Sequence, residues 1–467
     1  MSNNLELEDV TDKIVPDENY TFLNNEEAIE LYDTCVYIME EFIKNNPTAI
    51  TEPEFDDIFD ENIHELIKTH FDSDICYTDD AEEELEEIIE FAKADFFKFY
   101  MPRRSYPNTI ILNDNPDYDR ITQQLNILRL KPQPPQRTDE WYEFRHNLFT
   151  ASNAYKAFES QSTRNQLIYE KCQPLNLASD DDVKEVVLVN TNTPLHWGQK
   201  YEPLSVKIYE DIYETKIEDF GCIQHDTYKF LGASPDGINV DINSKRYGRM
   251  LEIKNIVNRE IDGIPKKEYW IQMQLQMAVC DLDECDFLET KFIEYPDVGA
   301  FNSDSNELDH EDEDGTAFTN VCLSKDGDIK GAIIYFHTKE GKPFYVYKPL
   351  DCIHPEDIDR WEENTIEMYQ GAKYGYTFMK FIYWKLEQMS CVLVTRNKEW
   401  FNANVGVLAD LWATVEAERV TGYEHRAPNR RQKKEGVDAT QLGVGIGVGI
   451  GKCFLHFEKI KVVKQDE

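Results

Sequence analysis

The feature that most restricts the fold of this chain is a short apolar run, RMLEIKNIV at residues 249–257, in which the opposite charges of Glu252 and Lys254 stand two residues apart. The run predicts a strand. Because residues two apart in a strand point to the same face, we expect Glu252 and Lys254 to lie side by side. A surface ion pair would explain them but would contribute little to stability. The alternative is a metal ligand beside a cation that serves a phosphate, and the surrounding sequence must decide.

Helical and strand periodicities alternate around this run, which predicts an α/β core with a mixed central sheet flanked by helices. Helices are expected at 193–214 and 266–280, and strands at 216–240, 284–295, 330–338 and 343–349. Upstream, Thr138 is expected to cap one helix and Ser152 to begin another. The last third returns to helical patterns at 355–374 and 378–389.

The N-terminal region is strongly acidic. Residues 24–100 predict three amphipathic helices, and residues 1–100 hold a net charge of −25 out of −41 for the 467-residue chain. The acidic faces suit either a solvated bundle that keeps the protein soluble or a docking surface for a basic partner. Because the Debye length is roughly 10 Å at 0.1 M salt, acids held away from a groove would barely repel DNA. Net charge therefore does not exclude an enzyme acting on DNA.

Composition divides the chain into five predicted parts. They are an acidic helical region, a linker with one helix, an α/β domain, a helical C-terminal extension and a tail, at residues 1–105, 106–136, 137–385, 386–425 and 426–467. The tail holds a basic cluster at 426–434, which suits nuclear targeting or a DNA contact, and a Gly-alternating run at 442–454. An acidic stretch at 302–315 is expected to be a solvated loop.

Membrane and secretory signals are lacking in the sequence. There is no uninterrupted apolar run of about 18 residues, and the polar start, MSNNLELEDV, does not resemble a signal peptide. Ten cysteines are scattered without a CxxC pair, so neither a zinc ribbon nor a disulfide framework is expected. The sequence therefore predicts a soluble intracellular protein with reduced thiols.

A second acidic residue gives the Glu252 and Lys254 pair a chemical use. Asp236 lies in GASPDG, at a predicted strand end sixteen residues before Glu252. Hydrolysis of a phosphodiester at neutral pH needs a hard cation, and Mg²⁺ is held by one or two carboxylates plus waters and phosphate. Asp236 and Glu252 meet that need, and the main-chain carbonyl of Ile253 could complete it. Lys254 could orient the attacking water or stabilise developing charge.

Asp236, Glu252 and Lys254 stand among five motifs that occur in order between residues 137 and 350. So many motifs in one order make a chance occurrence of the three residues an unsatisfactory explanation. The motifs are RTDEWYEFRHNLFTAS, WGQKYEP, SPDG, LEIK and YWIQMQ. Together they resemble the PD-(D/E)xK nuclease fold, in its lambda-exonuclease-like, YqaJ-type viral recombinase branch. The extended forms around LEIK and RTDEWYEFRHNL are most similar to proteins of nucleocytoplasmic large DNA viruses of the mimivirus kind.

The resemblance implies a role for each matching residue. Asp236 and Glu252 would bind the metals, Glu202 would lie near the same metal, Lys254 would activate the water, and Gln272 would help to hold the site together.

The opening motif implies a second pocket. Family members grip a 5′-phosphate with an Arg and a Ser seven residues apart, a spacing that Arg145 and Ser152 match. Ser152 is also expected at a helix N-terminus, where free N–H groups and the helix dipole favour a phosphate.

The implied activity is that of a Mg²⁺-dependent deoxyribonuclease with two metal ions, for which Mn²⁺ is an alternative. We expect it to digest double-stranded DNA ends from 5′ to 3′ in viral recombination, replication or repair. Two alternatives stay open, a structure-specific endonuclease on the same fold and a non-catalytic interaction protein.

The expected partners are DNA ends, a single-strand annealing or replication protein and further copies of the chain, without a membrane. The host cytoplasm, a viral factory and the nucleus are the expected locations.

Overall fold

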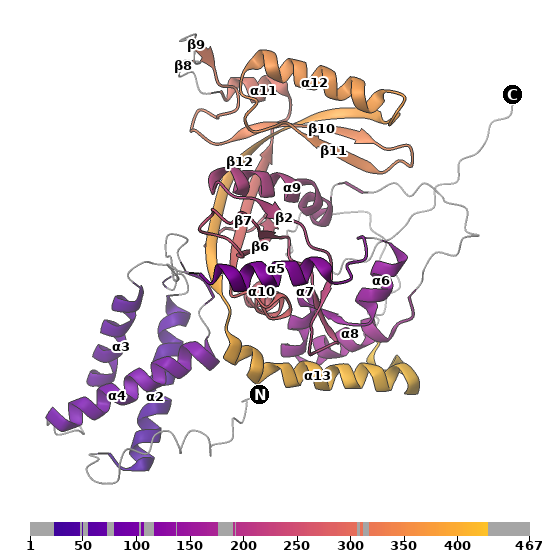
Figure 1. Cartoon of the computed structure of the whole chain (residues 1–467). Helices are drawn as coiled ribbons and strands as arrows, with labels where there is room; N and C mark the ends of the chain where they lie inside the picture. The colour runs from indigo at the N-terminus through magenta and orange to yellow at the C-terminus, as the bar shows by residue number, and fades with distance from the viewer. Residues whose placement is uncertain are drawn as a thin grey trace, which may run out of the picture. The chain divides into compact units, whose positions relative to one another are not determined.

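The structure is a computed structural model (Figure 1). It describes residues 23–46, 49, 55–71, 79–101, 104–106, 116–136, 138–175, 190–191, 193–305, 309–311 and 317–427. The Gly-alternating run, all but the first two residues of the basic cluster, and half of the acidic stretch at 302–315 lie outside the described residues. Within that stretch, Asp309–Glu311 forms strand β8, which pairs with β9 (Ala317–Thr319).

A seven-stranded mixed sheet organises the α/β part of the chain, with the strand order β11-β10-β12-β7-β6-β5-β2. The strands are β2 (Ile217–Glu218), β5 (Gly237–Asn239), β6 (Met250–Asn255), β7 (Glu284–Glu294), β10 (Lys330–His337), β11 (Pro343–Tyr347) and β12 (Thr377–Thr395). Only β6 and β7 run parallel among these neighbours. A parallel pair needs a crossover, and helix α10 (Lys267–Cys280) supplies it.

Two helices cover opposite faces of the central strands. Leu251 and Ile253 of β6 pack in a cluster with Tyr209 of α9 (Pro194–Ile212), whereas Met250 packs in the cluster that includes α10. The two-residue period of β6 therefore turns Glu252 and Lys254 toward the α10 side, as the sequence predicts.

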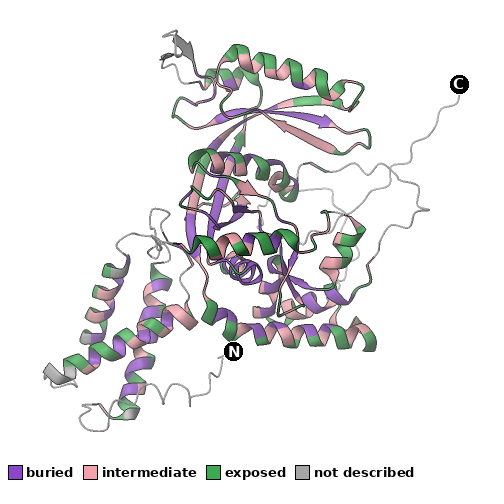
Figure 2. Cartoon of the chain, in the orientation of Figure 1, coloured by how far each residue is buried: buried purple, intermediate pink, exposed green. Residues whose placement is uncertain are grey.

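Helix α10 is buried on all sides from Trp270 to Cys280 (Figure 2). A helix buried all round belongs to a core rather than to a surface. Its three glutamines at 272, 274 and 276 are buried with it and need hydrogen-bond partners. Gln274 finds them at the end of β12, donating to Thr395 O at 2.8 Å and accepting from Asn397 N at 2.7 Å.

One sequence prediction about the C-terminal part is wrong. Residues 378–389, expected as a helix, lie in the 19-residue strand β12, which pairs with β7 and β10. The buried side chains of Ile382, Trp384 and Leu386 recur every second residue and pack beneath α9. The strand runs through the predicted boundary at 385/386, and α13 (Lys398–Thr421) contributes to the main core.

A three-stranded sheet, ordered β1-β4-β3, lies near the start of the α/β part. Its strands and the nearby helices are β1 (Phe149–Thr150), β3 (Ile223–Gln224), β4 (Leu231–Ala233), α6 (Asp139–His146), α7 (Ala151–Ala154), η3 (Tyr155–Phe158) and α8 (Gln161–Cys172). As predicted, Thr138 caps α6 by accepting a hydrogen bond from Trp141 N at 3.2 Å. The parallel pairing of β1 with β4 fixes this region beside the strand that precedes Asp236.

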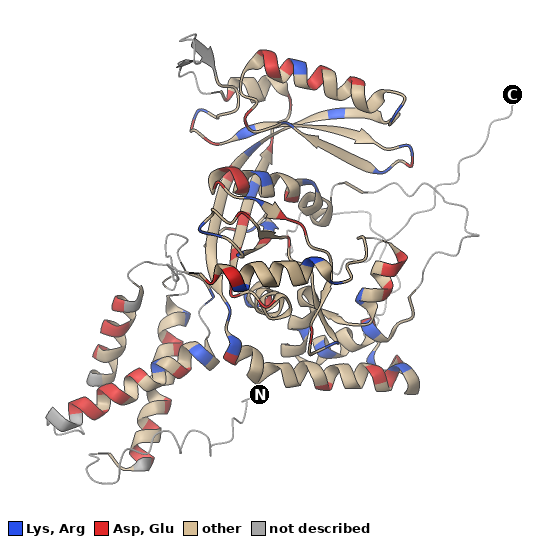
Figure 3. Ribbon diagram, viewed as in Figure 1, with Lys and Arg blue, Asp and Glu red and all other residues tan. Residues whose placement is uncertain are grey.

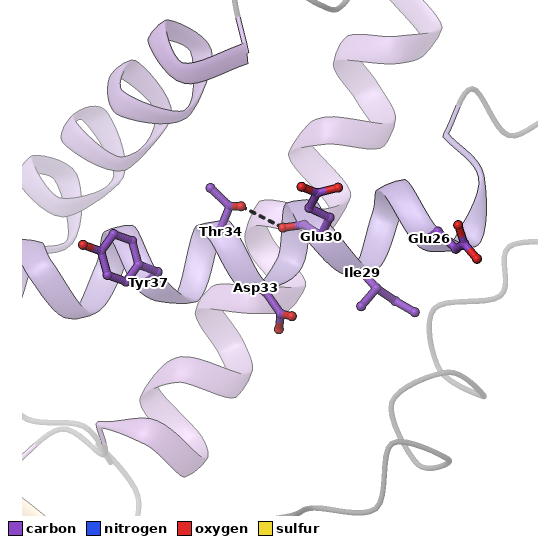
Figure 4. Close-up of a pocket in the computed structure, with 6 residues that line it drawn as sticks. All are labelled: Glu26, Ile29, Glu30, Asp33, Thr34 and Tyr37. Carbon is purple, nitrogen blue, oxygen red and sulfur yellow. Dashed lines mark hydrogen bonds between the residues drawn. The ribbon is translucent and has the colours of Figure 1, made fainter. Parts of the chain in front are cut away.

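The three predicted N-terminal helices are confirmed as α2 (Asn25–Asn45), α3 (Phe55–Phe71) and α4 (Asp79–Asp95), which continues into η2 (Phe96–Tyr100). They bury a hydrophobic cluster of their own. Their outer faces are acidic (Figure 3), and a shallow pocket on α2 is lined by Glu26, Ile29, Glu30, Asp33, Thr34 and Tyr37 (Figure 4).

The remaining elements are α5 (Tyr118–Leu130), α11 (Val298–Ser303), α12 (Pro355–Gln370) and η4 (Glu424–Arg426). None of the helices that the structure describes combines the length and the apolar character needed to span a membrane. The predicted fold class, a mixed central sheet flanked by helices with helical additions at both ends, is confirmed. The five-part division of the chain otherwise stays a prediction.

A buried charge network ties the sheet to α9 and yields a stability prediction. Asp286 of β7 is fully buried and is paired with Arg246 and Arg249, while Tyr209 OH donates to it at 2.6 Å. Asp286→Ala removes the buried carboxylate that Arg246 and Arg249 share and leaves Arg249 paired only with Glu284, so the free energy of unfolding in urea should fall by about 3–5 kcal/mol. Asp326→Ala, which changes an exposed loop residue, should alter it by less than about 0.5 kcal/mol. Equal losses in both variants would contradict the role of this network.

Candidate active site

Asp236 lies at the point where β5 begins to pair with β6. Its main-chain N–H donates to Leu251 O at 3.1 Å, and its carboxylate Oδ2 accepts from Ile253 N at 2.7 Å. The main chain of β5 pairs with β6 from Gly237 onward. Just before that point, the Asp236 carboxylate forms a further hydrogen bond to β6. Because the N–H and C=O of a strand residue point to the same edge, the Ile253 carbonyl also faces this edge. Asp236 and the Ile253 main chain are therefore brought together as the sequence predicts.

Glu252 is held by three side-chain donors. Its Oε1 accepts from Lys254 Nζ and, at 2.7 Å, from Gln272 Nε2, while its Oε2 accepts from Gln276 Nε2 at 2.7 Å. The residue is only 1% exposed. Burying a carboxylate is costly unless it is paired and hydrogen-bonded, and these donors meet that condition. Glu252 is therefore fixed in position by its own strand, β6, and by the two glutamines of α10.

Lys254 lies between the two acids and an aromatic ring. Its ammonium pairs with Glu252 and lies 4.9 Å from the ring centroid of Tyr269. Burial would lower the pKa of Lys254, but the Glu252 and Asp236 carboxylates outweigh it and raise that pKa above its usual value. The Lys254 side chain is therefore a stable cation beside both acids.

For Asp236, in contrast to Lys254, the surroundings disfavour the charged form. Its burial, followed by the negative charges of Glu252 and Glu202, raises the pKa of Asp236 well above the usual value, and Lys254 only partly opposes this. Three carboxylates thus act on one another at the end of β5. A cation placed there would relieve this repulsion and favour the charged form of Asp236.

Glu202 reaches this acidic group from α9. The end of β6 holds this part of α9 through Asn255, which accepts from Ser205 Oγ at 2.7 Å and donates to Gly198 O at 3.2 Å. Glu202 lies between these two contacts and is exposed. It acts on Asp236 through charge.

Gln276 is a site residue that the sequence analysis missed. It lies one helical turn after Gln272 on the same face of α10, and both amides donate to Glu252. It also lies 3.3 Å from Ser234 O, the first residue of SPDG. The four-residue spacing of the two glutamines was the signal, because residues four apart share a helix face.

Arg145 comes close to the same strand end from α6. Its guanidinium lies 4.6 Å from the Trp141 ring and donates weakly, at 3.4 Å, to Ser234 Oγ, two residues before Asp236. Ser152 is exposed, and its hydroxyl lies 3.3 Å from Thr150 Oγ1. Among the described residues, no hydrogen bond joins Arg145 to Ser152. The structure places Arg145 beside the site and leaves Ser152 accessible near it.

The physical basis expected for Ser152 is corrected. The helix that was expected to begin at Ser152 has Thr150 as its N-cap and spans only Ala151–Ala154. A four-residue helix aligns too few peptide dipoles to favour a phosphate at its N-terminus. Any contribution of Ser152 to anion binding therefore rests on its exposed hydroxyl.

The chemistry of the donors fits a hard divalent cation. Within the described ranges, no three His, Cys, Asp or Glu side chains gather closely enough to form a metal site by themselves. Mg²⁺ does not require such a group, because it is held by one or two carboxylates together with waters and substrate phosphate. Asp236, Glu252 and the Ile253 carbonyl supply oxygen ligands of that kind.

A comparison with protein families finds a match for the part of the chain that holds the candidate site. Residues 140–283, which include the first site residue and the end of α10, match the family described as the YqaJ-like viral recombinase domain. The chain thus carries a segment that matches the YqaJ-like viral recombinase domain. The match confirms the resemblance inferred from the five motifs, and it spans Arg145, Asp236, Glu252 and Gln272.

A viral relative extends the similarity beyond the YqaJ-like domain. The uncharacterized protein R354 of Acanthamoeba polyphaga mimivirus is 30% identical over 330 residues, which are 67% of this chain and 58% of that protein. The chain therefore spans a little over half the length of this relative. The similarity agrees with the expected likeness to mimivirus proteins.

Two solved structures are also similar in part. They are crystal structures of LHK-Exo, an alkaline exonuclease from Laribacter hongkongensis, one of them in complex with dAMP. Both are 18% identical and cover 60% of this chain and 94% of theirs, with TM-scores of 0.33 and 0.32. Likeness at this level adds no argument to the family assignment.

The glycine after Asp236 leads to a test of how tightly this strand end is packed. A Cβ on Gly237 would meet Ile217 Cγ2 at 2.2 Å, so close packing by β2 excludes a side chain there. Gly237→Ala should lower the free energy of unfolding by about 1–3 kcal/mol. Adding Ile217→Ala should remove the clash, so the double variant should lose less than the sum of the single losses. Strict additivity in chemical denaturation would contradict this packing.

Proposed function

We propose that this chain is a metal-dependent deoxyribonuclease, most specifically a 5′ to 3′ exonuclease on double-stranded DNA ends. The observation that carries the proposal is the convergence of Asp236, Glu252 and Lys254 at one strand end within a YqaJ-like viral recombinase domain. Two acids and a lysine in this arrangement suit phosphodiester hydrolysis, because the reaction needs a bound cation, a positioned water and charge stabilisation.

We propose that the cofactor is Mg²⁺, with Mn²⁺ as the alternative and room for two ions. Asp236, Glu252 and the Ile253 carbonyl would hold it. When bound, the metal supplies a Lewis acid for the scissile phosphate and lowers the pKa of water. Glu202 would add negative charge at the edge of the same site.

The chain's own residues then carry positioning and charge. In the proposal, Lys254, which the two carboxylates keep protonated, donates hydrogen bonds to the attacking water and offsets charge that develops on the phosphate. Gln272 and Gln276 of α10 each donate a hydrogen bond to one Glu252 oxygen and so restrict rotation of the carboxylate. The β5–β6 pairing holds Asp236 and Glu252 at a fixed separation on adjoining strands.

We further propose that Arg145 selects a 5′-terminal phosphate, with Ser152 as a second donor. Arg145 is suited to this task because it lies beside Ser234 and forms no ion pair with a carboxylate of the described residues. A planar guanidinium presents paired donors to phosphate oxygens. The end of a DNA strand would thus be held a short distance from Asp236.

The proposal predicts the loss of metal-dependent digestion in two single variants. Asp236→Asn removes a charged metal ligand and Lys254→Met removes the cation beside the water, so each should lower the rate of hydrolysis of linear duplex DNA by roughly 10²- to 10⁴-fold. The matched controls Asp219→Asn and Lys229→Met change exposed residues and should retain the wild-type rate. A chelator such as EDTA should abolish digestion by the wild type.

Closed circular duplex of the same sequence separates the exonuclease from the endonuclease. An exonuclease should leave the circle intact while it digests the linear form. Cleavage of both forms would replace the exonuclease by the structure-specific endonuclease. Unchanged digestion by both Asp236→Asn and Lys254→Met would reject the nuclease site itself.

A further inference from the structure

Three cations meet where helix α6 ends. Arg145 is the penultimate residue of α6, Lys171 is the penultimate residue of α8, and Arg419 lies in the last turn of α13. Lys171 Nζ donates to the Arg145 carbonyl at 2.7 Å. Residues more than 200 positions apart in the chain are thus joined around the residue proposed to hold a phosphate.

Arg419 joins the two helices. Its guanidinium donates to Lys171 O through Nε at 3.0 Å and through Nη2 at 2.8 Å, and Nη2 also donates to His146 O at 2.8 Å. The last carbonyls of a helix lack partners within the helix, and cationic side chains suit them. Lys171 and Arg419 thereby fix the C-terminal turn of α6, from which the Arg145 side chain extends.

The charge of this group is not balanced within the part of the chain that the structure describes. None of the three cations forms a salt bridge with a carboxylate there, although Lys171 is only 8% exposed. Burial, followed by the charges of Arg145 and Arg419, lowers the pKa of Lys171 to about 8. Burying an ammonium beside two guanidinium groups costs free energy, and an anion bound next to them would offset that cost.

The neutral groups beside Arg145 also suit an anion. The Cys222 thiol and the Ser234 hydroxyl lie beside the Arg145 guanidinium. Both are neutral donors, and Ser234 leads directly to Asp236 of the candidate active site. Of the three cations, Arg145 thus contacts the segment that carries Asp236, the proposed point of hydrolysis.

We propose that Lys171 is a positioning residue for Arg145, and that Arg419 locks the pair so that the three cations form one site for a DNA terminal phosphate. Arg145 contacts the phosphate, whereas Lys171 acts from behind, through the Arg145 main chain and through its charge. This inference rests on the proposed nuclease function.

The test compares two linear duplexes that differ only in a 5′-phosphate or a 5′-hydroxyl. For the phosphorylated duplex, Lys171→Met should raise KM on the order of 10-fold, because a nearby positive charge is lost, and should leave kcat unchanged. For the hydroxyl duplex, both constants should stay at the wild-type values. Lys171→Arg, which keeps the charge and the donor, should restore most of the preference, and Lys229→Met serves as the exposed control.

The outcomes distinguish the inference from a merely structural role. Equal changes on both duplexes, or no change on either, would overturn the role of Lys171, as would a wild-type enzyme that does not distinguish the two ends. If Lys171→Met does not fold by circular dichroism, Arg419→Lys replaces it, because a lysine cannot bridge the same carbonyls. It should show the same selective rise in KM. Failure of the wild type to digest either duplex would instead reject the proposed function.

Discussion

The buried carboxylate of Glu252 is the constraint on which the rest of the site depends. A charged group so far from water needs donors on both oxygens, and α10 supplies two of them from Gln272 and Gln276. The helix must therefore lie buried against β6, which it does as the crossover between parallel strands β6 and β7. Lys254 completes the set from the strand itself. The hydrogen bonds of the Glu252 side chain thus hold α10 on β6 and also position a carboxylate of the candidate site.

Charge is divided in a way that reconciles an acidic protein with a DNA substrate. Much of the negative charge lies on α2–α4, which bury a cluster of their own. The candidate site combines acids that suit a metal ion with Lys254, and the end of α6 gathers three further cations without a carboxylate partner among the described residues. The net charge of −41 therefore says little about the local field that a DNA end would meet.

The sequence predicts helices and strands well where the periodicity of the element itself decides its type. Helix α5 and strand β6 are found where their periodicities place them, and the shared face of Glu252 and Lys254 follows from strand geometry alone. Strand β12 was mistaken for a helix because its aromatic run suits either structure, and only pairing with distant strands decides. The helical spacing of Gln272 and Gln276 was a usable local signal, whereas the contact of Lys171 with the Arg145 carbonyl depends on packing between two separate helices, which no local pattern reveals. The N-cap expected at Ser152 lies two residues earlier, at Thr150.

The measurement that tests the central claim most directly is the binding of Mn²⁺ without DNA, followed by electron paramagnetic resonance. The account predicts saturable binding to the wild-type chain and its loss in Asp236→Asn, because the ion would be held chiefly by Asp236 and Glu252. Circular dichroism would verify that the variant keeps its fold. Equal Mn²⁺ affinity in the wild type and in Asp236→Asn would contradict the account, because the cation would then bind elsewhere.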